Sequence, residues 1–293
     1  MASPVPQQLT ISARGVDFHC LSIGDGPLAL CLHGFPDSAK TWLPLMSKLA
    51  DAGYRAVAPY MRGYAPTSIP ADGCYQTAAL SADAVALHEA LGAGSDAVII
   101  GHDWGAPATY GAALLAPERW HKVVGMAVPP GNAMGAAFVT NLTQLKRSWY
   151  MFFFQHPLAD LVVGANDLAY IDMLWNDWSP GFDGADSLRA TKDALRAPEN
   201  LAAALGYYRA TLGAGKRDPN LDELQARMGA EVPTQPLLYL HGENDGCIGR
   251  EVAEFAAAST PPNVEVRFVS GAGHFLQIEQ PDVVADHVIG WLA

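Results

Sequence analysis

The segment 97–107 (AVIIGHDWGAP) constrains the fold most, because it joins a buried strand to a helix through a very short turn. The apolar run 97–100 is typical of a strand that is covered on both faces. Gly101 and Gly105 flank the turn, where a side chain would crowd the neighbouring backbone. Such a turn lifts its central residue, Asp103, above the edge of the sheet. The sequence therefore predicts a carboxyl group presented at the carboxyl end of a buried strand.

Segments with strand and helix patterns alternate along the first 130 residues. Apolar or alternating runs predict the strands 16–24, 28–32, 55–59, 97–100 and 122–128. Helical periodicity between them predicts the helices 39–52 and 77–91 and a helix from about 104. The first strand alternates apolar and polar residues, as expected for an exposed antiparallel edge strand. This order predicts an α/β fold with a parallel sheet that helices cover on both faces.

The alternation stops at the segment 129–135 (PPGNAMG) and returns about a hundred residues later. Residues 131–230 have the pattern of aromatic-rich helices. Strands at 236–240 and 264–269, with helices after 250 and from 281, then restore the earlier order. We therefore predict a core in two parts, residues 1–130 and 231–293, with a helical cap of residues 131–230 inserted between them.

Composition and charge exclude several kinds of partner. The net charge is −12, and the 18 basic residues form no cluster that would bind nucleic acid or an anionic membrane. The N-terminal segment lacks the basic and apolar regions of a signal peptide, and no apolar run is long enough to span a membrane. We therefore expect a cytoplasmic protein. The four cysteines are scattered without the spacing of zinc ligands: Cys20, Cys31, Cys74 and Cys247. No metal or organic cofactor is expected, because the candidate catalytic residues described below would supply the nucleophile, the base and the hydrogen-bond donors.

Two later loops carry groups that could act together with Asp103. The segment 236–245 is a buried strand that ends in Glu243 and Asp245, and the Gly-rich loop 270–275 (SGAGHF) carries His274. Catalytic groups of open α/β sheets gather at the carboxyl ends of the strands, so these side chains are expected to meet. Taken alone, Asp103 could instead cap the following helix, since Asp is a favoured N-cap residue.

The turn GHDWG, the loop 32–36 (LHGFP) and the order of the acidic groups and His274 together resemble the α/β-hydrolase superfamily. The likeness is to its members with an aspartate nucleophile, the epoxide hydrolases. It extends over nearly the whole chain and implies the α/β-hydrolase fold, with a mostly parallel eight-stranded sheet and an inserted cap. The family pattern places the catalytic acid at Asp245 rather than at Glu243.

The resemblance implies a covalent mechanism. The carboxylate of Asp103 would displace the ring oxygen of an epoxide at a saturated carbon, and the resulting ester would keep its carbonyl on the enzyme. Water activated by His274 would then attack that carbonyl, while Asp245 fixes the imidazole. The backbone N–H groups of Phe35 and Trp104 would form the oxyanion hole.

Two cap segments, 147–155 (RSWYMFFFQ) and 205–209 (LGYYR), are similar to the epoxide hydrolase helices that bring two tyrosines to the oxirane oxygen. The similarity implies that Tyr150 and Tyr208 protonate the developing alkoxide. Tyr207 cannot face the same spot as Tyr208, because adjacent helix residues point about 100° apart. These aromatic residues could also simply pack the cap onto the core. The side chains expected around the substrate are His33, Pro36, Trp149 and Phe275.

The sequence leaves three functions open. The first is an epoxide hydrolase that uses a small hydrophobic epoxide and water, as a monomer or a homodimer. The second is a haloalkane or haloacid dehalogenase with the same triad, since the indole of Trp104 could bind halide, although Phe35 offers no side-chain donor. The third is a catalytically silent fold that binds ligands or proteins, which the complete triad disfavours. The segment 175–178 has no predicted role beyond shaping the cap loop.

Overall fold

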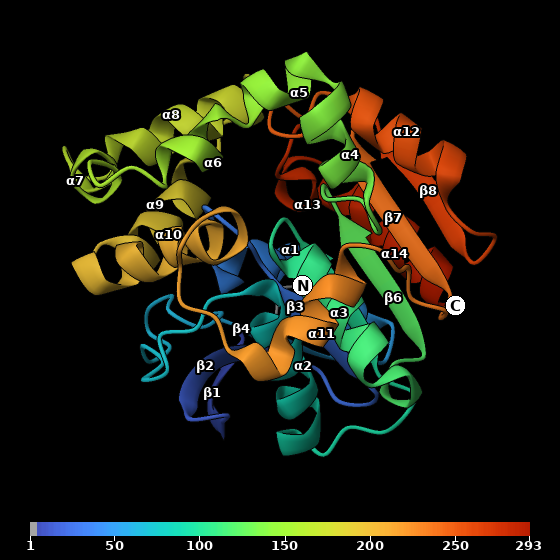
Figure 1. The fold of residues 1–293 in the computed structure, drawn as a ribbon. Helices are drawn as coiled ribbons and strands as arrows, with labels where there is room; N and C mark the ends of the chain where they lie inside the picture. The colour runs from blue at the N-terminus through green and yellow to red at the C-terminus, as the bar shows by residue number, and fades with distance from the viewer. Residues whose placement is uncertain (1–4) are drawn as a thin grey trace.

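The computed structural model describes residues 5–293, and its centre is an eight-stranded sheet (Figure 1). The strands lie in the order β1-β2-β4-β3-β5-β6-β7-β8. β2 pairs antiparallel with β1 and β4, and all other neighbours are parallel, which confirms the predicted fold class. The strands are β1 Gln7–Ala13, β2 Val16–Ile23, β3 Leu28–Leu32, β4 Arg55–Pro59, β5 Val98–His102, β6 Lys122–Met126, β7 Leu237–Gly242 and β8 Val264–Val269.

The edge of the sheet differs from the prediction. The strand expected at the edge, 16–24, is β2, and it has a neighbour on each side. The edge strand is β1, whose side chains are mostly exposed. A two-residue turn joins β1 to β2, and Arg14 and Gly15 both have positive φ angles there, 49° and 72°. This turn suits the twist of a hairpin, and it was the signal that could have revealed β1.

Helices cover both faces of the sheet, as the sequence predicts. Helices α1 and α14 pack on one face, and α2, α3 and α12 pack on the other. Successive side chains of β5 serve the two faces in turn: Ile99 packs beneath α2 and α3, and Ile100 packs beneath α1 and α14. The core helices are α1 Leu43–Asp51, α2 Thr77–Ala90, α3 Gly105–Leu115, α12 Arg250–Ser259, α13 Leu276–Glu279 and α14 Pro281–Leu292, with 3₁₀ turns at Ala39–Trp42 and Pro117–Arg119.

The chain between β6 and β7 forms the inserted helical cap. Figure 1 shows α5, α6 and α8 arching over one end of the sheet, whereas α11 lies beside α3. Within residues 5–293, no helix has the length and apolar character needed to cross a membrane. The cap helices are α4 Ala133–Thr140, α5 Leu142–Arg147, α6 Trp149–Phe153, α7 Ala159–Gly164, α8 Ala169–Trp178, α9 Ala185–Leu195, α10 Pro198–Leu212 and α11 Asp222–Met228, with a 3₁₀ turn at Pro219–Leu221.

A buried ion pair ties the loop after β4 to α2. The side chain of Arg62 is 0% exposed, and its Nη2 donates to Oδ1 of Asp83 at 2.7 Å. Replacing Asp83 with Asn would leave the guanidinium with only the longer pair to Asp72 at 3.4 Å, so the free energy of unfolding should fall by about 3 kcal/mol, measured by urea denaturation. Asp186→Asn is the control, because its pair with Arg189 is exposed and is worth less than about 1 kcal/mol. Equal losses in both variants would contradict the expectation.

Candidate active site

Asp103 lies at the sharp turn between β5 and α3, in the left-handed region with a φ of 51°. This conformation costs a non-glycine residue about 1–3 kcal/mol, so it persists only where the surrounding structure holds it. A side chain on Gly101 would meet the carbonyl oxygen of Gly105, and one on Gly105 would meet the carbonyl oxygen of Leu32. The two flanking glycines are therefore required by the close approach of three backbone segments.

The carboxyl group of Asp103 is almost enclosed, with the residue only 5% exposed. Its Oδ1 accepts a hydrogen bond from the backbone N–H of Phe35 at 2.7 Å. A side chain on Gly34 would overlap this oxygen and the backbone nitrogen of Trp104, so the two lie side by side. Oδ2 faces Nε2 of His274 at 3.4 Å. One oxygen is thus held by a backbone donor, and the other faces the histidine.

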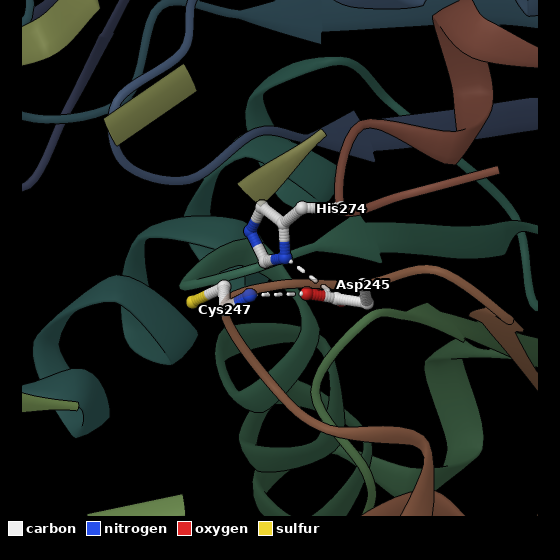
Figure 2. A group of neighbouring side chains, drawn as sticks. All are labelled: Asp245, Cys247 and His274. Atoms are coloured by element: carbon white, nitrogen blue, oxygen red, sulfur yellow. Dashed lines mark hydrogen bonds and ion pairs between the residues drawn. The ribbon is translucent and has the colours of Figure 1, made fainter. Parts of the chain in front are cut away.

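The late loops bring His274 and Asp245 together, as Figure 2 shows. Nδ1 of His274 lies 2.9 Å from Oδ2 of Asp245, and both side chains are fully buried. Oδ1 of Asp245 accepts from the backbone N–H groups of Cys247 and Ile248 at 2.8 and 2.9 Å. Glu243, the competing acid, instead pairs with Arg250 at the surface. Asp103, His274 and Asp245 therefore form a connected row.

Charge and burial set the protonation of this row. Burial lowers the pKa of His274, but the carboxylates of Asp245 and Asp103 outweigh it and raise that pKa to about 10. Burial raises the pKa of Asp245, but the neighbouring His274 overcomes this and leaves it below its usual value. The two neighbouring acidic side chains therefore favour the protonated form of His274.

Cys247 is close enough to Asp245 and His274 for the three to be considered as metal ligands, with donor atoms within 4.8 Å of one another. Their donor atoms are already engaged, however. Figure 2 shows Asp245 bound to the His274 ring and to the Cys247 backbone. The Cys247 thiol contacts the Tyr150 hydroxyl at 3.4 Å, and burial raises the thiol pKa well above its usual value. The group fits a hydrogen-bonded dyad better than a metal centre.

A cavity of about 340 Å³ opens above Asp103 between the core and the cap. Its walls are largely apolar, and both Tyr150 and Tyr208 contribute to them. The residues that line it are Thr77, Asp103, Trp104, Pro107, Tyr110, Val128, Pro129, Gly131, Asn132, Met134, Gly135, Phe138, Ser148, Tyr150, Met151, Tyr208, Thr211, Leu212, Gln225, Met228, Gly229, Cys247 and Ile248.

The structure separates the adjacent tyrosines of α10. The hydroxyl of Tyr207 donates to the backbone oxygen of Arg62 at 2.8 Å, away from the cavity. The hydroxyl of Tyr208 is buried and makes no hydrogen bond to any residue from 5 to 293. The rings of Tyr208 and Tyr150 lie 5.7 Å apart between centroids. Burial raises the pKa of both Tyr150 and Tyr208 well above 10, so both hydroxyls are protonated at neutral pH.

The four side chains expected around the substrate are not among the described residues that line the cavity. Nε2 of His33 accepts from the backbone of Met61 at 3.0 Å, so this ring braces its own loop. Phe275 stacks on Trp175 with centroids 3.9 Å apart. Trp149 is 44% exposed, because as the neighbour of Tyr150 in the short helix α6 it points about 100° away from it. Pro36 contacts the cap through its backbone carbonyl oxygen, which accepts a hydrogen bond from the indole N–H of Trp175 at 2.9 Å.

The sequence reasoning missed the role of the end of α8. The indole of Trp178 packs against His274 and Tyr150, with ring centroids 5.0 and 4.9 Å apart. This contact joins the row of Asp103, His274 and Asp245 to the cap tyrosine. The repeated tryptophans of the segment 175–178 were the available signal, because large aromatic residues dominate buried contacts between elements.

Comparison with known proteins identifies the family. A family model described as alpha/beta hydrolase fold matches residues 27–281. An epoxide hydrolase of Caballeronia sordidicola is 30% identical, and the match covers 98% of this chain and 93% of that protein. A putative epoxide hydrolase structure from Klebsiella pneumoniae superposes with a TM-score of 0.83 at 26% identity, over 98% and 97% of the two chains.

A second structure, Bacillus megaterium epoxide hydrolase in complex with an inhibitor, gives a TM-score of 0.81 at 27% identity. That match covers 98% of this chain and 99% of the other. The fold, the match of the family model and the relatives over nearly the full length agree. The chain belongs to the α/β-hydrolase family, within its epoxide hydrolase branch.

Proposed function

We propose that this enzyme opens a small apolar epoxide to a vicinal diol through an ester on Asp103. The observation that carries the proposal is the arrangement at the cavity. The carboxyl group of Asp103, held by the Phe35 N–H, shares an apolar cavity with the protonated hydroxyls of Tyr150 and Tyr208. A nucleophile and two proton donors around one apolar space suit a strained ether whose leaving oxygen needs a proton.

In the first step, Oδ2 of Asp103 attacks an epoxide carbon and the C–O bond of the ring breaks. The leaving oxygen takes a proton from one of the tyrosines, so no free alkoxide forms. The ester carbonyl oxygen, Oδ1, keeps the hydrogen bond from the Phe35 N–H. The Trp104 N–H, which lies beside this oxygen, would add a second donor for the oxyanion of the second step.

Ester formation also changes His274. The ester has no charge, so one of the two carboxylates that raise the pKa of His274 disappears. The imidazolium can then return a proton to the tyrosinate and become the neutral base that the second step requires. Water loses one proton to this imidazole and attacks the carbonyl carbon of Asp103. The bond to the ester oxygen then breaks, and the second proton of the water passes to that oxygen, so the diol leaves while the carboxylate and the imidazolium re-form. Asp245 holds the ring through both states.

The tyrosines separate epoxide chemistry from halide chemistry. Tyr150→Phe combined with Tyr208→Phe should lower epoxide turnover by about 10²–10⁴-fold, because the alkoxide would leave without a proton donor. Any bromoalkane activity should change little, since bromide leaves without a proton. Parallel assays of diol and bromide release measure both. Tyr207→Phe is the matched control and should retain wild-type turnover, because its hydroxyl bonds to the Arg62 backbone.

The proposal itself is tested by an activity panel. Wild-type enzyme should form diols from aryl and alkyl epoxides and release little bromide from bromoalkanes of similar size. Bromide release without diol formation would favour a dehalogenase. If the folded protein forms no diol from any epoxide and releases no bromide from any bromoalkane, a ligand-binding role would be favoured.

A further inference from the structure

The end of α8 contacts the loops that carry the catalytic acid and the histidine. The backbone oxygen of Trp178 accepts from the N–H of Gly246 at 3.0 Å and from the N–H of His274 at 3.1 Å. Gly246 directly follows Asp245, so one carbonyl group of the cap holds both loops. The indole of Trp175 binds the oxyanion loop through Pro36 at 2.9 Å.

Ser179, the next residue, holds the histidine loop through its side chain. Its hydroxyl accepts from the N–H groups of His274 and Phe275, at 3.0 and 3.3 Å, and donates to Oε1 of Glu279 at 2.6 Å. The other oxygen of Glu279 accepts from the N–H of Gly273 at 2.7 Å. Ser179 is only 2% exposed, so water does not readily replace these bonds.

These bonds act on a loop that has little stiffness of its own. Gly271 and Gly273 flank Ala272 just before His274, and glycine has more backbone freedom than any other residue. A side chain on Gly273 would overlap Ser179, so the glycine is what allows the hydroxyl to approach the loop. The position of the imidazole therefore depends on Ser179 and Glu279 as well as on Asp245.

We propose that Ser179 and Glu279 are positioning residues that hold His274 for hydrolysis of the ester intermediate. The inference rests on the proposed function. Asp103 is fixed separately, by its turn and by the Phe35 N–H, so the alkylation step does not depend on this pair. The water-activating step does depend on it, because the imidazole must direct Nε2 at a water molecule beside the Asp103 carbonyl.

Ser179→Ala tests the proposal by separating the two chemical steps. The rate of ester hydrolysis in single-turnover experiments should fall about tenfold, because the Phe275 N–H loses its buried acceptor and the His274 N–H keeps only the Trp178 oxygen. The rate of alkylation should not change, so kcat/KM should stay within about twofold of wild type while kcat and KM fall together. The ester on Asp103 should accumulate and appear by mass spectrometry during turnover.

Two further variants sharpen the test. Glu279→Gln keeps the shape of the side chain, but its NH₂ group would face either the Ser179 hydroxyl or the Gly273 N–H, both of which donate to the carboxylate. This variant should therefore show the same slower ester hydrolysis and the same accumulation of ester as Ser179→Ala. Ser81→Ala is the control, because it also removes a buried hydroxyl, one that bonds to Thr77 within α2, and it should behave as wild type. Amide hydrogen exchange at residues 273–275 should become faster in the first two variants only.

A fall in kcat/KM equal to the fall in kcat, without ester accumulation, would overturn the positioning role. So would unchanged hydrolysis and unchanged amide exchange in Ser179→Ala. Failure of the proposed function looks different, because the wild-type enzyme and His274→Gln would then give no ester with any epoxide.

Discussion

Replacing Asp103 with Asn is expected to lower epoxide turnover by about 10⁴-fold or more. Asn has nearly the same shape and can still accept the Phe35 N–H, but its neutral amide cannot displace the ring oxygen. The measurement is diol formation under saturating substrate. Because Asn keeps the shape of the side chain and the Phe35 hydrogen bond, the variant should still fold, and its circular dichroism and urea unfolding serve as the control.

Slow recovery of activity in Asp103→Asn would itself be informative. Deamidation restores the carboxylate and adds 1 Da, so intact mass and activity should rise together. Activity close to wild type, in protein whose mass is unchanged, would remove Asp103 from the mechanism.

His274→Gln is expected to stop the reaction after its first step, with turnover reduced by about 10²–10⁴-fold. Alkylation of Asp103 needs no base, so the ester should form and persist. Mass spectrometry should then find an added mass equal to that of the epoxide, on the peptide that contains Asp103. A variant that is inactive but carries no added mass would mean that His274 acts before the ester forms.

Isotopic oxygen tests the same step in the wild-type enzyme. In the proposed mechanism water attacks the carbonyl carbon of Asp103, so one turnover in heavy-oxygen water should label the carboxyl group of Asp103 and leave the first diol unlabelled. Label found directly in that diol would mean that water attacks the epoxide itself.

The parts of the molecule that depend on short sequence segments could be predicted. The apolar runs of β3 and β5 and the glycines around Asp103 determine the sheet and the turn almost locally. The acid and histidine loops follow from the rule that parallel strands end on one side of the sheet. β1 was not predicted, because its side chains are mostly exposed and its sequence has little of the apolar pattern that marks a strand.

The cavity wall could not be predicted in the same way, because it depends on how separate helices pack. Tyr150 faces the cavity while its neighbour Trp149 is partly exposed, and no property of the two residues alone distinguishes them. The same holds for Tyr207 and Tyr208. Their different surroundings depend on how α10 packs against the loop that contains Arg62. The role of Ser179 depends on contacts with residues about 95 positions away in the chain.

The absence of a side chain at Gly34 has a consequence for redesign. Any larger residue there would overlap both the Asp103 side chain and the nitrogen of Trp104, so this position offers no room for variation. The cap residues Met134, Phe138 and Leu212 also line the cavity, and none of them takes part in the hydrogen bonds of Asp103, His274 and Asp245 described above. Libraries that aim to change enantiomer preference should therefore diversify the cap wall and keep the loop invariant.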